Sequence, residues 1–141
     1  MRKQSKGMTL IEMIVTIVIL SIIVMMAFPS YMGYLRKTRR TDATVSLLDL
    51  ASRMERYYAE NNNSYASANI TGNLGLSSAT TSQGYYTLSI ASSSASAYTL
   101  QATPVTGTSQ ANDSTCDNFT LTQTGQRGIS GTGSVNECWG N

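Results

Sequence analysis

Residues 7–28 read GMTLIEMIVTIVILSIIVMMAF, and this stretch decides how the chain is organised. From residue 8 to residue 28 the run is apolar except for two threonines, one serine and the carboxylate of Glu12. A helix of 21 residues spans about 30 Å, which is the thickness of the hydrocarbon core of a bilayer. The sequence therefore predicts a membrane-spanning helix over 8–28.

Glu12 is the single charged side chain in this apolar run. A charge inside a membrane-length helix is costly, so such a residue generally has a function and a partner. A carboxylate in the first turn of a helix is also stabilised by the helix dipole, which gives Glu12 a purely structural interpretation. A short basic segment, residues 1–7, precedes the run and contains Arg2, Lys3 and Lys6.

Pro29 interrupts the helical pattern, and we expect a kink there because proline removes one helical hydrogen bond. Beyond it, apolar residues recur at three- and four-residue spacing as far as Asn61, while the opposite face carries most of the charged side chains. The apolar positions are Tyr31, Tyr34, Leu35, Ala43, Leu47, Leu50, Ala51, Met54, Tyr57 and Tyr58. The sequence predicts an amphipathic helix over 29–61.

The remainder, 62–141, predicts a loop followed by a small antiparallel sheet. Residues 62–83 are rich in Ser, Thr, Asn and Gly. Alternating apolar residues then predict strands over 85–90, 98–105 and 119–123, with turns at 92–96 and 124–126. Pro104 is expected to end the second strand or to mark a sheet edge. Packing this sheet on the amphipathic half of the helix buries both faces, so the predicted fold class is α+β.

Composition limits the chemistry that the chain can perform. It has 141 residues, 10 Lys+Arg against 8 Asp+Glu, and no histidine. Without histidine, and with only Cys116 and Cys138 as soft ligands, we expect no metal, no cofactor and no enzymatic activity. An even cysteine count outside the cytoplasm indicates a Cys116–Cys138 disulfide, and two free thiols are the alternative.

Taken together, these motifs resemble the precursor of a type IV pilin. Gly7-Met8-Thr9-Leu10-Ile11-Glu12 matches the processing motif of that family, in which Phe usually stands where Met8 does. The resemblance continues in the stretches 28–31, 36–40, 53–58, 84–88, 98–104 and 121–125, a pattern similar to the PilE-like branch. It therefore extends over nearly the whole chain, and it implies the type IV pilin fold.

The resemblance implies a mechanism of processing and assembly. A prepilin peptidase would cut between Gly7 and Met8 and methylate the new Met8 amine. Glu12 of an incoming subunit would then pair with the Met8 amine of a neighbour, as both charges enter an apolar environment. The protein would reside in the inner membrane through residues 8–28, with its C-terminal domain in the periplasm. An inner-membrane assembly platform would then extract it into an extracellular fibre with other copies and other pilins. That fibre would serve adhesion, twitching motility or DNA uptake.

The basic cluster Arg36 to Arg40 leaves several interpretations open. It fits a solvated face near lipid headgroups, contacts with Asp42 or Asp49 of a neighbouring subunit, or DNA binding, for which a basic stripe alone is a weak indication. Two other functions also remain open: a pseudopilin of a type II secretion system, and a membrane-anchored binding domain that never polymerises.

Overall fold

The computed structural model describes residues 7–140. The leader predicted at 1–7 lies outside the described residues except for Gly7. The chain divides into two compact units, one ending at Leu35 and the other beginning at Arg36. Each unit is described on its own below.

Helix α1 runs from Leu10 to Glu60 and contains Pro29 in its interior. The helix assignment is unbroken across Pro29, and the predicted kink stays a prediction. The hydroxyl of Ser21 donates to the Ile17 carbonyl at 2.7 Å, so this polar side chain is satisfied within its own helix.

The C-terminal end of α1 is formed by asparagines. Asn62 and Asn63 have φ values of 51° and 56°, the left-handed conformation that asparagine tolerates better than most residues. The Asn63 amide turns back to the Tyr58 carbonyl at 3.0 Å, which satisfies one carbonyl of the last turn. The predicted end near Asn61 is therefore confirmed.

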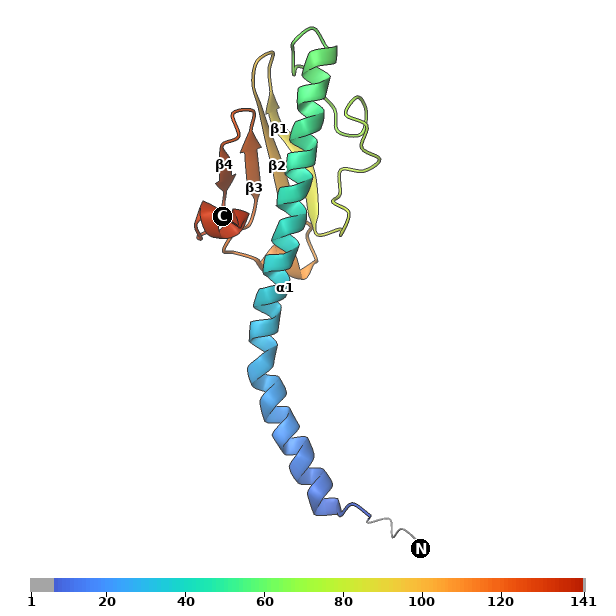
Figure 1. Cartoon of the computed structure of the whole chain (residues 1–141), viewed down its shortest axis with the longest axis vertical. Helices are drawn as coiled ribbons and strands as arrows, with labels where there is room; N and C mark the ends of the chain where they lie inside the picture. The colour runs from blue at the N-terminus through green and yellow to red at the C-terminus, as the bar shows by residue number, and fades with distance from the viewer. Residues whose placement is uncertain (1–6, 141) are drawn as a thin grey trace, which may run out of the picture. The chain divides into compact units, whose positions relative to one another are not determined.

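The second unit contains a four-stranded antiparallel sheet in the order β1-β2-β3-β4, which Figure 1 shows with its labels. The strands are β1 (Tyr86–Ser93), β2 (Tyr98–Pro104), β3 (Phe119–Thr122) and β4 (Arg127–Ile129). Pro104 ends β2, one of the two outcomes expected of it. The three predicted strands are confirmed within a few residues, although β1 continues to Ser93, into the stretch predicted as a turn.

Three elements were not predicted. The first, β4, has three residues with a glycine in the middle, too short to show alternation. A 3-10 helix, η1, covers Ser109–Asn112, and a short helix, α2, covers Val135–Trp139. The start of α2 does carry a sequence signal, because the Ser134 side chain accepts a hydrogen bond from the Glu137 amide at 3.2 Å.

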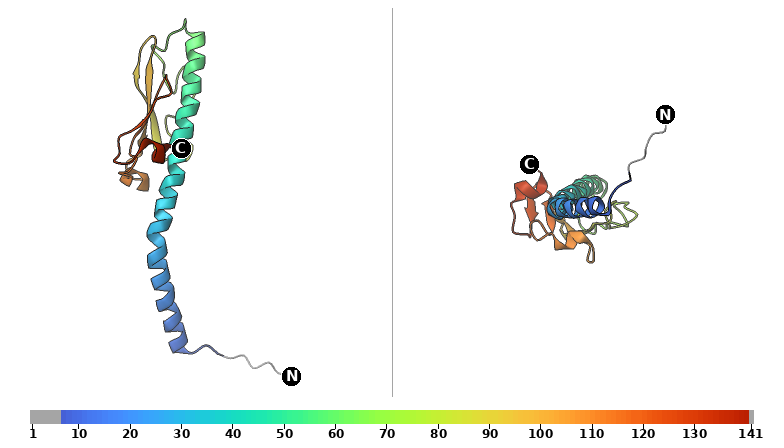
Figure 2. Two further views of the ribbon diagram at one scale, coloured as in Figure 1. Left: turned by 60° about the vertical axis from the view of Figure 1, so that its left-hand side comes forward. Right: turned by 90° about the horizontal axis from the view of Figure 1, so that it is seen from below.

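The core of the second unit lies between the 36–60 part of α1 and one face of the sheet, and the first view in Figure 2 shows the two layers side by side. Four helix residues with 4-3-4 spacing, Ala43, Leu47, Leu50 and Met54, are fully buried. The inward residues of the strands complete the core, chiefly Tyr86, Leu88, Leu100, Ala102, Phe119 and Leu121. The sheet residues between them are mainly Thr, Ser and Gln, so the other face is polar and uncharged.

Candidate functional site

The predicted cleavage point lies in exposed, non-helical chain. Met8 is 67% exposed, and α1 begins only at Leu10. A Cβ atom added at Gly7 would meet nothing within 4 Å, so neither packing nor a close approach within the described chain requires glycine there.

Glu12 and Thr9 form a reciprocal pair at the start of α1. The Glu12 amide donates to the Thr9 hydroxyl at 3.3 Å, and the Thr9 amide donates to Glu12 Oε2 at 3.5 Å. This is the arrangement of a capping box, with threonine at the N-cap and glutamate three residues later. The second hydrogen bond is long, and both residues are exposed, so the pair is a weak cap. Glu12 therefore has a local structural role in the isolated chain.

The rest of the first unit presents apolar side chains on all sides. From Met8 to Tyr34 its large hydrophobic residues are between 47% and 78% exposed, except for the partly buried Met32. By length and composition, α1 passes the test for a membrane-spanning helix. Tyr31 and Tyr34, which the sequence placed on the apolar stripe of 29–61, are exposed at 59% and 69%. A continuous apolar surface of this kind requires lipid or other chains to cover it.

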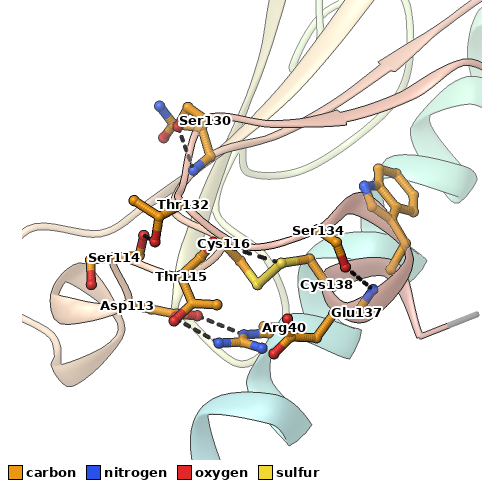
Figure 3. The surroundings of a disulfide bond; sticks show 12 residues. Arg40, Asp113, Ser114, Thr115, Cys116, Ser130, Thr132, Ser134, Glu137 and Cys138 are labelled. Atoms are coloured by element: carbon orange, nitrogen blue, oxygen red, sulfur yellow. Dashed lines mark hydrogen bonds and ion pairs between the residues drawn. A yellow bond between two sulfur atoms is a disulfide. The ribbon is translucent and has the colours of Figure 1, made fainter.

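The basic cluster 36–40 is not a simple solvated face, because two of its arginines are used inside the chain. The Arg40 guanidinium makes two hydrogen bonds of 2.7 Å to the two oxygens of Asp113, with side chains 11% and 1% exposed. Figure 3 shows this pair beside the disulfide. Arg39 lies over the ring of Tyr85, 4.1 Å from its centroid, and hydrogen-bonds the Ser109 hydroxyl.

The acidic residues expected to face a neighbouring subunit are also engaged within the chain. Asp42 is only 7% exposed, and its Oδ1 accepts a hydrogen bond from the Ser82 hydroxyl at 3.2 Å. Of the interpretations left open for the basic cluster, contact with Asp42 of a neighbouring subunit does not fit this burial, because the loop before β1 covers Asp42. Asp49 remains exposed and pairs with Arg53 one turn along the helix at 2.9 Å.

The Arg40–Asp113 pair belongs to a buried polar network. The fully buried Gln110 donates from Nε2 to Asp113 Oδ2 at 3.0 Å and to the Tyr86 hydroxyl at 2.8 Å. The Asp113 carboxylate raises the pKa of Arg40, chiefly through their hydrogen bond. Burial raises the pKa of Tyr86 to about 12. The network fastens η1 and the loop around it to α1 and β1.

A second cluster of polar contacts lies near the end of α1. The Glu55 carboxylate accepts hydrogen bonds from the hydroxyls of Tyr65 at 2.9 Å and Tyr98 at 3.0 Å. Burial, then the hydrogen bond to Glu55, raises the pKa of Tyr65 to about 12, and the same causes raise that of Tyr98. The rings of Tyr65 and Tyr98 meet edge to face, 4.8 Å apart. These tyrosines pack against each other and tie α1 to the loop after it and to β2.

Cys116 and Cys138 form a disulfide, with Cα atoms 5.7 Å apart. Figure 3 shows the bond joining the loop before β3 to α2. The backbone nearby is tightly packed, because a Cβ at Gly131 would lie 2.3 Å from the Thr115 carbonyl oxygen. The Trp139 ring of α2 packs edge to face on Phe119 and donates from Nε1 to the Gly128 carbonyl at 3.2 Å.

Within residues 7–140 no group of three or more His, Cys, Asp or Glu side chains is placed to hold a metal ion. The residues that sequence reasoning missed, Asp113 and Gln110, are structural. Their pairing with α1 had no local signal, since 73 positions separate Arg40 from Asp113.

Comparison with known proteins identifies the family. Residues 29–120 match the family model of the type IV minor pilin ComP, DNA uptake sequence receptor. That match covers more than half of the chain. The chain belongs to this family of type IV minor pilins. Residues 2–28 also match the prokaryotic N-terminal methylation motif.

The fold agrees with a solved pilin. The chain is similar to the non-core minor pilin PilV of Neisseria meningitidis, with 26% sequence identity and a TM-score of 0.56. The alignment covers 72% of this chain and 92% of PilV. No curated protein matches the sequence. The type IV pilin fold is thus established, and the family implies assembly with other pilins and processing by a prepilin peptidase.

Proposed function

We propose that this chain is a pilus subunit that is cut between Gly7 and Met8, methylated on Met8, and held in the inner membrane by residues 8–28 until assembly. The domain with the sheet would then lie in the periplasm. Support comes from the methylation motif, the exposed apolar helix and Gly7. Since the described fold does not require glycine at position 7, its presence there fits a requirement of the peptidase instead.

Glu12 carries the assembly step in this proposal. As subunits join, the Glu12 carboxylate would give up its weak hydrogen bond from the Thr9 amide and form an ion pair with the cationic Met8 amine of a neighbour. Away from water, a charge left without its partner is costly. A subunit would therefore enter the fibre in the axial register that places its Glu12 beside the Met8 amine of a neighbour.

Two substitutions separate the capping role of Glu12 from the proposed ion pair. Glu12→Gln keeps a residue that suits the N3 position of a capping box but removes the charge, whereas Glu12→Val removes both. If the ion pair governs assembly, both variants enter sheared fibres poorly while their amounts in the membrane match wild type. Normal incorporation of Glu12→Gln would refute the ion pair and leave only the cap. Mass spectrometry of the fibres for an N-methylated Met8 peptide tests the processing.

A second proposal concerns DNA uptake, which the description of the matching family names. The charges of this chain restrict how it would bind DNA. Among the described residues after α1, Arg127 is the single Lys or Arg, whereas Asp113, Asp117 and Glu137 are acidic. On α1, Lys37 and Arg56 are exposed. Arg127 lies over the ring of Trp139, 5.1 Å from its centroid. We therefore propose that phosphate contacts come from Lys37 and Arg56.

The salt dependence of DNA binding tests this assignment. Each phosphate contact contributes about −0.9 to the slope of log K against log salt, so two contacts predict a slope no steeper than about −2. Arg56→Gln should reduce that slope by about 1, while Thr103→Ala on the uncharged outer sheet face should leave it unchanged. A deletion strain that takes up DNA at the wild-type frequency would refute the uptake role and leave the pilus-subunit role intact.

A further inference from the structure

The first two cations of the basic cluster 36–40 are not neutralised within the described chain. The other two, Arg39 and Arg40, bind groups of the folded domain. Arg36 is partly buried, and its Nε atom has no hydrogen-bond partner among the described residues. Lys37 is exposed, and no described carboxylate forms an ion pair with it. Both charges are therefore available to an anion from outside the chain.

The sequence around these two cations carries no exposed negative charge. No Asp or Glu occurs between Glu12 and Asp42. Asp42 is itself buried under the loop before β1, and the next acid, Asp49, pairs with Arg53. The electrostatic potential near residues 36 and 37 is therefore positive, and it attracts anionic ligands.

Arg36 and Lys37 follow closely on the apolar run. Arg36 comes eight positions after Phe28, so at 1.5 Å per residue no more than about 12 Å of helix separates their Cα atoms. Side chains of a helix lean toward its N-terminus, and long basic ones extend their charge toward the membrane interface. Tyr31 and Tyr34, a residue type enriched at such interfaces, lie between the two in sequence. A chain anchored through 8–28 thus brings both cations within reach of lipid headgroups.

We propose that Arg36 and Lys37 bind the phosphates of anionic phospholipids while the chain is still in the membrane. This inference rests on the proposed anchoring through residues 8–28, with the sheet domain in the periplasm. Basic residues are less common on the translocated side of a membrane than on the cytoplasmic side, so two unpaired cations there need a specific partner. Extraction into the fibre breaks this contact and frees Lys37 for the DNA contact proposed above.

Spin-labelled lipids test the proposal on the mature full chain. The chain is reconstituted in mixed vesicles of phosphatidylethanolamine and phosphatidylglycerol, and electron spin resonance measures the fraction of each labelled lipid that the protein restricts. One Lys or Arg near an anionic surface strengthens binding about fivefold, so wild type should prefer phosphatidylglycerol by about that factor. The double variant Arg36→Gln with Lys37→Gln should show no preference. The matched control Arg56→Gln removes an exposed cation twenty positions further along and should keep it.

The possible failures separate this inference from the proposed function. A wild-type chain without preference, or a double variant that keeps it, would overturn the inference and spare the anchoring, provided that the chain resists alkaline extraction from the vesicles. A wild-type chain that alkali extracts would overturn both. Should Arg36→Gln alone weaken DNA binding while the lipid preference persists, Arg36 belongs to a nucleic-acid surface and the inference fails. The inference fails equally if inorganic phosphate abolishes the preference at constant ionic strength.

Discussion

Removing the Asp113 carboxylate should destabilise the second unit more than a typical point substitution. In Asp113→Ala, the Arg40 guanidinium loses two hydrogen bonds of 2.7 Å while its side chain stays 11% exposed. Breaking a buried ion pair by removing one partner costs about 3–5 kcal/mol, because the remaining charge is left unpaired. Domains of this size are stable by only about 5–15 kcal/mol, so the expected loss is a large part of the total.

The loss is large enough to measure by two methods. Unfolding of about 100 residues has an entropy near 0.2 kcal/mol/K, so a loss of about 4 kcal/mol lowers Tm by about 15–20 °C. Trp139 is the only tryptophan in the chain and is 7% exposed, so its fluorescence reports the unfolding of this unit. A urea titration of the mature chain in detergent micelles gives the free energy directly.

A double-mutant cycle supplies the control. Arg40→Met alone leaves Asp113 buried and unpaired and should cost a similar amount. Asp113→Leu is the second single variant of the cycle. The combination of Arg40→Met with Asp113→Leu removes both charges and should cost much less than the sum of these two singles, because apolar residues of similar volume replace buried ion pairs at little net cost. A cost below about 1 kcal/mol for Asp113→Ala, or additive single effects, would refute the reasoning.

Three further predictions concern the same unit. Gly131→Ala should cost about 1–3 kcal/mol in urea unfolding, since its Cβ would lie 2.3 Å from the Thr115 carbonyl oxygen; an unchanged midpoint would contradict this contact. Replacing Cys116 and Cys138 together by Ser should cost about 3 kcal/mol, as expected for a closed loop of 22 positions, and reductant should then have no further effect on the unfolding midpoint. The pKa of Tyr86, raised to about 12, favours the protonated phenol in the folded state, so its stabilisation is complete below pH 10 and falls as pH rises from 10 to 12. Urea midpoints across that range, with phenolate absorbance, check the direction, and a midpoint independent of pH would contradict it.

The helical part of the fold could be predicted because its signals are local. The apolar run at 8–28 and the three- and four-residue spacing that follows determine where α1 lies, and the asparagines at 61–63 mark its end. Two of the elements that were not predicted differ in whether the sequence carries a local signal for them. The strand β4 carries no readable alternation in Arg127-Gly128-Ile129, whereas α2 begins with Ser134 and Glu137 at the spacing of a capping box.

The polar interior could not be predicted, because its partners meet only in the folded chain. Arg40 lies in a run of basic residues that looks solvated, and nothing near it in sequence points to Asp113 or Gln110. Asp42 illustrates the opposite case, because its charge suggested an exposed residue whereas the folded chain buries it. It stands beside the buried Ala43 at the edge of the core stripe, and the Ser82 hydroxyl, from a loop without regular structure, satisfies one of its oxygens.

Because several cations are engaged within the chain, its net charge is a poor guide to how many cations can reach the phosphates of DNA. The sequence has a formal net charge of +2, but three of its basic residues precede Met8. Of the remaining cations, Arg40 is neutralised by Asp113 and Arg53 pairs with Asp49. Arg39 lies over the ring of Tyr85, and Arg127 lies over that of Trp139. Because polyanion binding depends on cations that can reach phosphates, a count of Lys and Arg overstates the DNA affinity of this chain. A shallow salt dependence follows from the fold itself.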